Sequence, residues 1–335
     1  MNQEKVINRW VMVGAALIVQ VCLGVLYAWS VFRPVFEKDF GWTKAQTGYP
    51  YQASLLFFAI GMIVAGRIQD RIGPRKVAIA GGILLALGAA LTGVVGNTVV
   101  GVLITYGVLG GLGVGFAYVT PVATLVKWFP DKRGLITGLA VFGFGVATVI
   151  FAPVINGLLK SVGIDVTFYI LAVIFLVLVC GAGSLFRVPP TGWKPAGWNP
   201  PAATVRAHAV DSPVGQTLRT WQFWALWVVY FLGAGVGLMT IGKAKPLGLD
   251  VAHVSDSLAT VGVMLLGIFN ALGRLAWGSV SDRLGRLRTI MVMFVLYVVA
   301  FLGLLPWKDN AATWLSGICL VGFCFGGYLA IMPSL

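Results

Sequence analysis

An arginine stands inside a long apolar stretch of this chain. Arg274 lies between Val261 and Trp277, among residues that are apolar or small except for Asn270. A charged side chain at such a position costs about 3 kcal/mol or more in a bilayer unless it faces water, a partner or a ligand. A guanidinium is a planar fork of five donors that stays protonated, which suits a carboxylate. We therefore predict that Arg274 binds an anionic group; snorkelling to the interface or a structural ion pair is the alternative.

Other side chains can complete such a site. Asn270 precedes Arg274 by one helical turn on the same face, where it adds a hydrogen-bond donor. Asp256, at the start of the same stretch, is the nearby acid and the candidate for proton coupling. Aromatic residues near the centres of other apolar stretches can enclose a ligand or simply pack, and buried tyrosine hydroxyls require hydrogen-bond partners. The candidates are Tyr27, Tyr118, Phe144 and Phe325.

Catalytic and metal-binding chemistry is not indicated. The two histidines, His208 and His253, are far apart in connecting segments, and the four cysteines lie in apolar stretches without metal-ligand spacing. We expect a protein that is not an enzyme and that needs neither a cofactor nor a metal.

The elements that position these residues are membrane-spanning helices. Hydrophobic residues make up 59% of the 335 and charged residues 10%, against about 25% charged in soluble domains. Windows of about 19 residues predict ten spans in an all-α membrane protein. These spans lie near 11–32, 47–66, 77–96, 99–126, 134–158, 166–186, 221–242, 257–279, 289–305 and 313–335.

The charge distribution gives an orientation. The net charge of +13 invites a nucleic-acid interpretation, but most of the 24 lysines and arginines occupy the N-terminus and every second connection. This alternation predicts a multi-pass protein of the cell membrane with a cytoplasmic N-terminus, and no nucleic-acid partner. We expect Lys243 and Lys245 to lie in a solvated outer loop, or else to form an electropositive vestibule.

The chain nearly repeats itself after 212 residues. The turn with Gly66, Asp70, Arg71 and Gly73 returns with Gly278, Asp282, Arg283 and Gly285. Pro34 and Pro246 are related by the same shift. The repeat predicts two homologous helical bundles, residues 1–186 and 220–335, joined by a cytoplasmic linker at 187–219 rich in proline and tryptophan. The second bundle has four spans against six, so we expect the chain to be a fragment of a longer protein.

The repeat also shows where the two halves differ. The shift places Arg274 opposite Met62, and Asn270 opposite Phe58. This asymmetry is expected if one half holds the charged head of a ligand and the other offers an apolar wall. The repeated charged turns lack the long glycine loop and the strand-to-helix context of a phosphate-binding loop, so we interpret them as structured turns.

These residues resemble the major facilitator superfamily, whose hallmark turn matches both repeated turns. Within it the chain is similar to the oxalate/formate antiporter group and related monocarboxylate transporters, notably around Tyr27 and from Asn270 to Trp277. The resemblance implies two pseudo-symmetric six-helix bundles, the second truncated here, and repeated turns that gate conformational change. It also implies that Arg274 binds the substrate carboxylate and that the four aromatic candidates line the substrate cage. Asn270 falls where animal monocarboxylate transporters usually carry an acid implicated in proton coupling.

We therefore expect a secondary transporter that works by alternating access, functional as a monomer in the bilayer. Its substrate would be a small monocarboxylate such as lactate, formate or acetate, or else oxalate, moved with a proton or against an anion. A proton-independent oxalate/formate exchanger, or a carrier of another small organic anion, is the alternative. A channel is not favoured, because no continuous polar stripe runs along several spans.

Overall fold

The computed structural model describes residues 8–190, 193–195, 214–304 and 310–332, and every regular element in them is helical. The first part of the chain forms α1 (Arg9–Leu23), η1 (Gly24–Val31), α2 (Arg33–Phe40), η2 (Gln46–Gly48), α3 (Tyr49–Ile72), α4 (Pro74–Val95), α5 (Val99–Val102), η3 (Leu103–Gly110), α6 (Gly111–Trp128) and α7 (Arg133–Gly183). The second part forms α9 (Val214–Thr217), α10 (Trp221–Asp250), α11 (Asp256–Leu284), α12 (Arg286–Leu304) and α13 (Ala311–Ile331). The prediction of an all-α membrane protein is confirmed.

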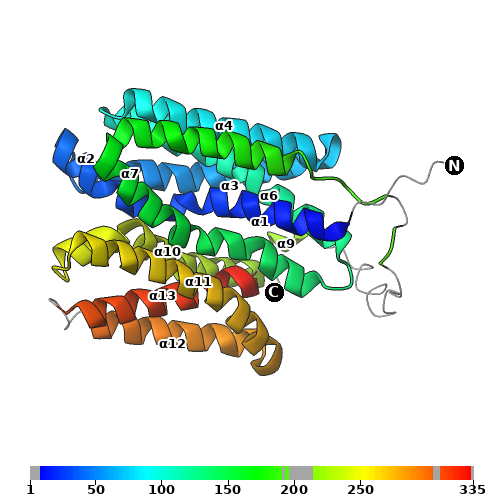
Figure 1. Cartoon of the computed structure of the whole chain (residues 1–335). Coiled ribbons are helices and arrows are strands. Elements are labelled where there is room, and N and C mark those ends of the chain that lie inside the picture. Colours follow the sequence, from blue (N-terminus) through cyan, green and yellow to red (C-terminus); the bar gives the residue numbers. More distant parts are fainter. Residues whose placement is uncertain (1–7, 191–192, 196–213, 305–309, 333–335) are drawn as a thin grey trace.

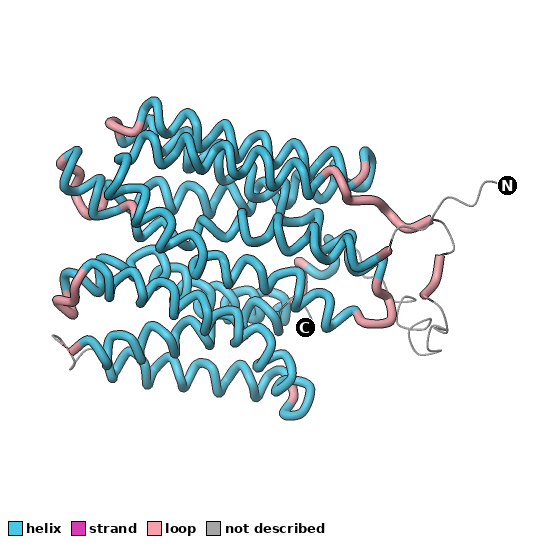
Figure 2. The backbone as a smooth tube through the Cα atoms, in the orientation of Figure 1, coloured by secondary structure: helices cyan, strands magenta, loops and turns pink. Residues whose placement is uncertain are grey.

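The long helices run roughly side by side and are joined by short connections at the two ends of the molecule (Figure 2). Within the described residues, eight segments are long and apolar enough to cross a membrane. One of them, Gly138–Gly183, has 46 residues, whereas about 20 suffice for one crossing. The chain reverses inside α7 at Gly163, whose φ of 79° is in the left-handed region that favours glycine. The helix α12 is not among the eight, so the count of ten spans stays a prediction.

The helices gather into two groups (Figure 1). Helices α1 to α7 pack on one another and form the N-terminal group, and α10 to α13 form the C-terminal group. The groups meet mainly where α11 packs on α7 and where α10 packs on η1. The exact division into bundles at 1–186 and 220–335 stays a prediction, since much of the expected linker at 187–219 lies outside the described residues.

The repeated turns have the same backbone. Gly73 ends α3 with φ 84° and Gly285 ends α11 with φ 83°, both left-handed. A residue with a side chain is strained there, so glycine is needed at both places. Asp70 and Arg71 are exposed at the end of α3. The described backbone therefore repeats over the 212-residue shift, although the Asp282 side chain lies outside the description.

Local signals explain how α11 begins, which matters because it carries Arg274. The Ser255 side chain accepts a hydrogen bond from the Leu258 backbone N–H and caps the helix. Asp256 follows in the first turn, where a negative charge is favoured by the helix dipole.

Candidate functional site

Arg274 is buried between the two groups of helices. Its side chain is 2% exposed, and Nη1 donates a hydrogen bond to the backbone carbonyl of Val141 on α7. Its Nε has no partner among the described atoms. In the part of the chain that the structure describes, no Asp or Glu forms an ion pair with it. The guanidinium therefore lies in the interior bonded to a neutral backbone carbonyl, and among the described residues no carboxylate pairs with it.

Glycines fix the position of α11 against α13. A Cβ added to Gly322 would lie 2.7 Å from the Leu266 carbonyl oxygen, and one added to Gly326 would overlap the Asn270 carbonyl oxygen. The two backbones are thus in direct contact, as small residues allow in membrane helices.

The contact between α11 and α7 is equally close. A Cβ on Gly145 would lie 3.0 Å from Asn270 Oδ1, and one on Gly267 would lie 2.9 Å from the Gly145 carbonyl oxygen. The α7–α11 contact therefore sets how Arg274 and Asn270 are presented to the N-terminal group.

Asn270 differs from its predicted role. It is fully buried, and its Nδ2 donates to the Gly322 carbonyl oxygen over 3.4 Å. Its Oδ1 has no partner among the described atoms. We predicted that Asn270 adds a donor to the site, whereas in this conformation the donor is used by α13 and the acceptor is the free atom.

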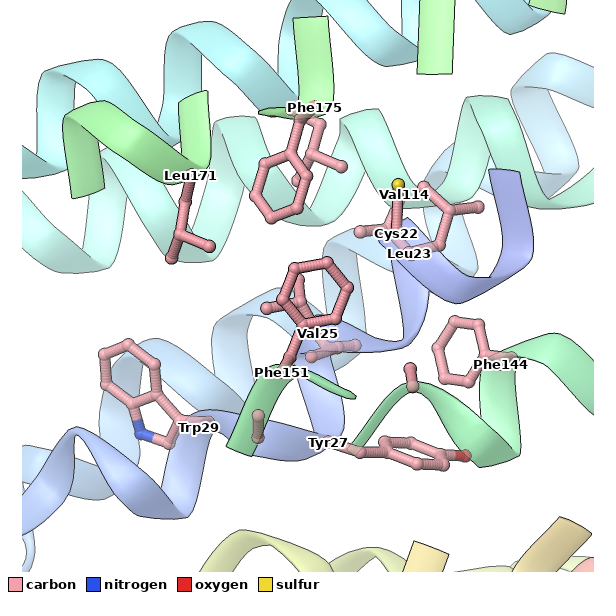
Figure 3. Close-up of a cluster of buried hydrophobic side chains, with 14 of the residues drawn as sticks. Cys22, Leu23, Val25, Tyr27, Trp29, Val114, Phe144, Phe151, Leu171 and Phe175 are labelled. Atoms are coloured by element: carbon pink, nitrogen blue, oxygen red, sulfur yellow. The ribbon is translucent and has the colours of Figure 1, made fainter. Parts of the chain in front are cut away.

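The four predicted aromatic residues form one cluster. The Tyr27 ring lies 4.8 Å from Phe144 and 6.1 Å from Phe325, and Tyr118 lies 5.5 Å from Phe144, all between ring centroids. Figure 3 shows Tyr27 and Phe144 side by side within the buried core. Tyr27 belongs to η1, a 3₁₀ segment that follows α1, and such segments often mark functional hinges.

One member of this cluster, Phe58, was not predicted. Phe58 packs edge-on against Tyr118 at 5.1 Å and lies parallel to Phe144 at 6.2 Å. It is the residue that the repeat places opposite Asn270, so the shift of 212 residues was a signal for it. Tyr230 on α10 was not predicted either; it interacts electrostatically with Tyr118 and Arg274 and has no comparable sequence signal.

The charge of Arg274 reaches the aromatic cluster. It interacts electrostatically with the hydroxyls of Tyr27, Tyr118 and Tyr230. The cation thus interacts with three phenolic groups that come from three helical segments, η1, α6 and α10. Because Tyr27, Phe144 and Phe325 are all 5% exposed or less, the site is closed in this conformation.

Cavities elsewhere are not extensions of this site. One cavity lies inside the N-terminal group and is lined by apolar and aromatic residues, among them Val25, Val114, Leu171 and Phe175, which Figure 3 labels. Arg274 does not line it.

Asp256 lies at the opposite end of α11 from the repeated turn. Eighteen residues separate it from Arg274, about 27 Å along the helix. One carboxylate oxygen lies 2.7 Å from Lys245 Nζ, and the other lies 2.7 Å from Lys160 Nζ and accepts from Asn156 Nδ2 at 3.2 Å. Asp256, the candidate for proton coupling, therefore contacts two lysines and not Arg274.

Lys245 was wrongly predicted to lie in a solvated loop. It is 2% exposed, because α10 continues through Pro246 to Asp250. We call this end of the molecule the Asp256 end. Lys243, by contrast, is exposed as predicted, although it too lies in α10 and not in a loop.

The residues of the repeated motif lie at the ends of α3 and α11. Gly66, Asp70 and Arg71 belong to the C-terminal part of α3, and Gly278, Asp282 and Arg283 to that of α11, while Gly73 and Gly285 end the two helices. Gly278 follows Arg274 by one helical turn on α11, and the gating role of these residues stays a prediction.

Known transporters are similar to this chain in sequence. The chain is 32% identical over 331 residues to the uncharacterised MFS-type transporter YhjX of Escherichia coli K12, covering 98% of this chain and 80% of that protein. It is 30% identical over 330 residues to the oxalate:formate antiporter of Oxalobacter formigenes, covering 98% of this chain and 76% of the antiporter.

Solved structures share the fold. A bacterial homologue of the human lysosomal transporter Spinster, in an inward-facing and occupied conformation, superposes with a TM-score of 0.69 at 18% identity. The superposition covers 96% of this chain and 73% of that one. The profile of the Major Facilitator Superfamily matches residues 10–335. The chain is therefore a multi-pass membrane protein that belongs to the Major Facilitator Superfamily, a family of transporters and not of enzymes.

Proposed function

We propose that this transporter moves small carboxylates across the cell membrane by alternating access. The observation that carries the proposal is the buried guanidinium of Arg274, which faces an aromatic cluster and has no acid partner among the described residues. A buried cation of this kind is stabilised by an anion that arrives from outside the protein. The similarity to the oxalate:formate antiporter of Oxalobacter formigenes supports a carboxylate as that anion.

Each residue of the site has a distinct role in binding the substrate. The substrate carboxylate replaces the Val141 carbonyl as the partner of Arg274, in a bidentate pair. The hydroxyls of Tyr27 and Tyr118 donate to the carboxylate. Phe144 and Phe325 cover the short carbon body of the substrate. The free Oδ1 of Asn270 accepts from a substrate hydroxyl, where one is present.

A single cation favours a singly charged substrate. Among the described residues, Arg274 is the cation that reaches the aromatic cluster. Lactate, formate and acetate each carry one negative charge and can be neutralised by it. Oxalate carries two, so we rank it below the monocarboxylates.

Exchange is favoured over proton symport through Asp256. This carboxylate is bound by Lys160 and Lys245 and lies about 27 Å along α11 from Arg274. An exchanger needs no titrating acid, because the substrate charge itself releases Arg274 from Val141. The second candidate function is therefore a proton-independent oxalate/formate exchanger, and a carrier of another small organic anion is the third.

The distribution of basic residues gives the orientation that we propose. The N-terminus faces the cytoplasm, and the Asp256 end faces the outside. Hydrogen bonds and ion pairs join the two groups of helices at the Asp256 end. The conformation described here is then closed to the outside, and the carrier works as a monomer with one site between its groups.

The test is uptake of labelled lactate, formate, acetate and oxalate by proteoliposomes that contain the chain. Arg274→Gln should abolish uptake, whereas Arg288→Gln, a change of an exposed arginine on α12, should not. Uptake that rises when the vesicles are preloaded with substrate, and that is insensitive to an uncoupler, supports exchange. Equal uptake by the wild type and Arg274→Gln would refute the proposed site.

A further inference from the structure

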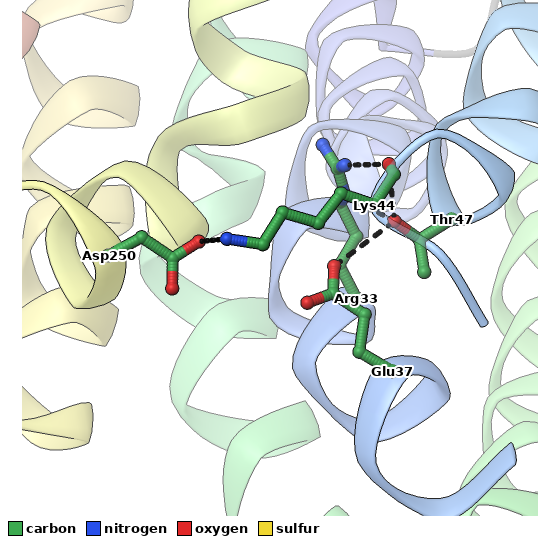
Figure 4. A network of polar contacts seen from close by, with 5 residues as sticks. All are labelled: Arg33, Glu37, Lys44, Thr47 and Asp250. Atoms are coloured by element: carbon green, nitrogen blue, oxygen red, sulfur yellow. Dashed lines mark hydrogen bonds and ion pairs between the residues drawn. The ribbon is translucent and has the colours of Figure 1, made fainter. Parts of the chain in front are cut away.

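The second half of α10 is bonded to the N-terminal group at four places. Tyr51 Oη donates to the Leu238 carbonyl oxygen at 3.3 Å, and Arg33 Nη1 donates to that of Gly242 at 2.9 Å. Lys245 Nζ donates to Asn156 Oδ1 at 2.6 Å. Lys44 Nζ pairs with Asp250 Oδ2 at 2.6 Å, as Figure 4 shows. These contacts run along residues 238–250 and close the Asp256 end.

Arg33 is the most constrained of these groups. It is 4% exposed, and all of its donor nitrogens are bonded to uncharged oxygens. Nε donates to Thr47 Oγ1 at 3.0 Å, Nη2 to the Lys44 carbonyl at 2.6 Å, and Nη1 crosses to Gly242. Figure 4 shows the side chain close to Lys44 and Thr47. A buried cation thus links the two groups through a backbone carbonyl.

A proline explains why that carbonyl is available. In an α-helix the Gly242 carbonyl would accept from the backbone N–H of residue 246. Residue 246 is Pro246, which lies inside α10 and has no N–H. The proline therefore leaves the Gly242 carbonyl without a donor in its own helix, and Arg33 supplies one from the opposite group.

The repeat makes this arrangement reciprocal. Arg33 and Lys245 are separated by the same 212 residues as the two halves, and each directly precedes a proline, Pro34 and Pro246. They are 4% and 2% exposed. Each cation reaches into the other group, Arg33 to Gly242 and Lys245 to Asn156. Equivalent positions of the two halves thus carry the same buried, crossing cation.

We infer that Arg33 and Lys245 form a reciprocal latch that holds the Asp256 end closed, with Pro246 providing the acceptor for Arg33. When the groups separate at this end, both cations lose their crossing acceptors and gain water. This exchange of partners keeps the closed state favoured without preventing opening. The inference rests on the alternating-access part of the proposed function and not on its substrate.

The test is hydrogen–deuterium exchange of the full chain in lipid nanodiscs without substrate. The backbone amides of residues 47–54, apart from Pro50, are monitored, because Tyr51 in this segment of the N-terminal group bonds to α10 and the segment is unchanged in every variant. Pro246→Ala restores an N–H to the Gly242 carbonyl and weakens the latch without touching Arg33. Arg33→Lys keeps the charge but loses the fork that spans three acceptors.

We expect each variant to raise the exchange rate of residues 47–54 about tenfold, which corresponds to about 1.4 kcal/mol. The double variant should exchange no faster than the faster of the two single ones, since both weaken the same crossing bond, from Arg33 to the Gly242 carbonyl. Pro121→Ala is the matched control, because Pro121 lies inside α6 of the N-terminal group.

Unchanged exchange in Pro246→Ala overturns the inference, as does an equal increase in Pro121→Ala. If Arg33→Lys does not fold, Pro246→Ala decides alone. Because no substrate is present, failure of carboxylate transport leaves this result unaffected.

Discussion

The α7–α11 contact predicts a strong effect of one methyl group at Gly267. A Cβ there would overlap Thr148 Oγ1 and would lie 2.9 Å from the Gly145 carbonyl oxygen and 3.1 Å from Thr148 Cβ. At Gly145 itself a Cβ would lie 3.0 Å from Asn270 Oδ1 and 3.1 Å from the nearest atoms of Ala271. Both glycines are needed for the contact, but the added carbon fits far worse at Gly267.

The distances give the expected magnitudes. Ordinary van der Waals contact begins at about 3.4 Å, so Gly145→Ala requires a shift of a few tenths of an ångström. Gly267→Ala requires the helices to separate or Thr148 to rotate. Overpacking costs about 1–3 kcal/mol, and we expect Gly145→Ala near the lower limit and Gly267→Ala near the upper one. Arg274 lies two turns after Gly267, so the separation also weakens its bond to Val141 and lowers transport.

Thermal unfolding of the purified chain, combined with a double-mutant cycle, measures these effects. Thr148→Ala removes Oγ1, and the double variant Thr148→Ala/Gly267→Ala should recover much of the lost stability. Gly157→Ala is the control on the same helix α7, since nothing lies within 4 Å of its added Cβ. Equal unfolding temperatures for Gly267→Ala and Gly157→Ala, or no recovery of stability with Thr148→Ala, would show that the α7–α11 contact is not as tight as described.

Three further predictions concern charge and packing. Burial raises the pKa of Asp131, but two hydrogen bonds from Arg9 outweigh it, and the pKa lies below the ordinary 3.8. The stabilisation by this pair is therefore present above pH 3.8 and is lost as the pH falls through the pKa of Asp131 in the folded protein. Below pH 3.8 the difference in unfolding temperature between the wild type and Asp131→Asn should shrink. Asp256→Asn leaves the buried Lys245 without its charged partner and should lower the free energy of unfolding. Breaking a fully buried pair costs about 3–5 kcal/mol, and we expect a smaller loss here because the Asp256 side chain is 40% exposed. Lys245→Met added to Asp256→Asn should restore much of the unfolding temperature, and failure to do so would contradict the pairing. Phe144→Ala should cost about 3–5 kcal/mol and Phe144→Leu under about 1.5 kcal/mol in the same assay, because leucine refills most of the space.

The sequence was sufficient for the class of fold and for its internal repeat. Long apolar stretches allow few structures other than membrane helices, because backbone groups in lipid must bond internally. The 212-residue shift was equally informative, and Gly73 and Gly285 have nearly the same positive φ in the structure. The shift also placed Phe58 opposite Asn270, where the aromatic cluster is found.

The partners of the polar groups could not be predicted in the same way. Hydropathy ended the seventh span at residue 242, whereas α10 continues to Asp250 and buries Lys245. A proline near charged residues is typical of a loop, but here Pro246 lies inside α10 and frees the Gly242 carbonyl, which accepts a hydrogen bond from Arg33. Such a bond depends on which residue of the other group lies opposite the free carbonyl. Local sequence patterns do not encode this long-range contact.

The most direct test of the account is equilibrium binding of lactate, formate and oxalate to the chain in nanodiscs, measured by titration calorimetry for the wild type, Arg274→Lys and Arg274→Gln. Loss of a partner from a buried charge pair costs about 2–5 kcal/mol, which is about 30-fold or more in affinity. We predict that Arg274→Gln loses at least this much affinity for each carboxylate that the wild type binds, and that Arg274→Lys retains part of it. Binding of the same carboxylates with unchanged affinity by Arg274→Gln would contradict the central claim that the buried guanidinium receives the substrate.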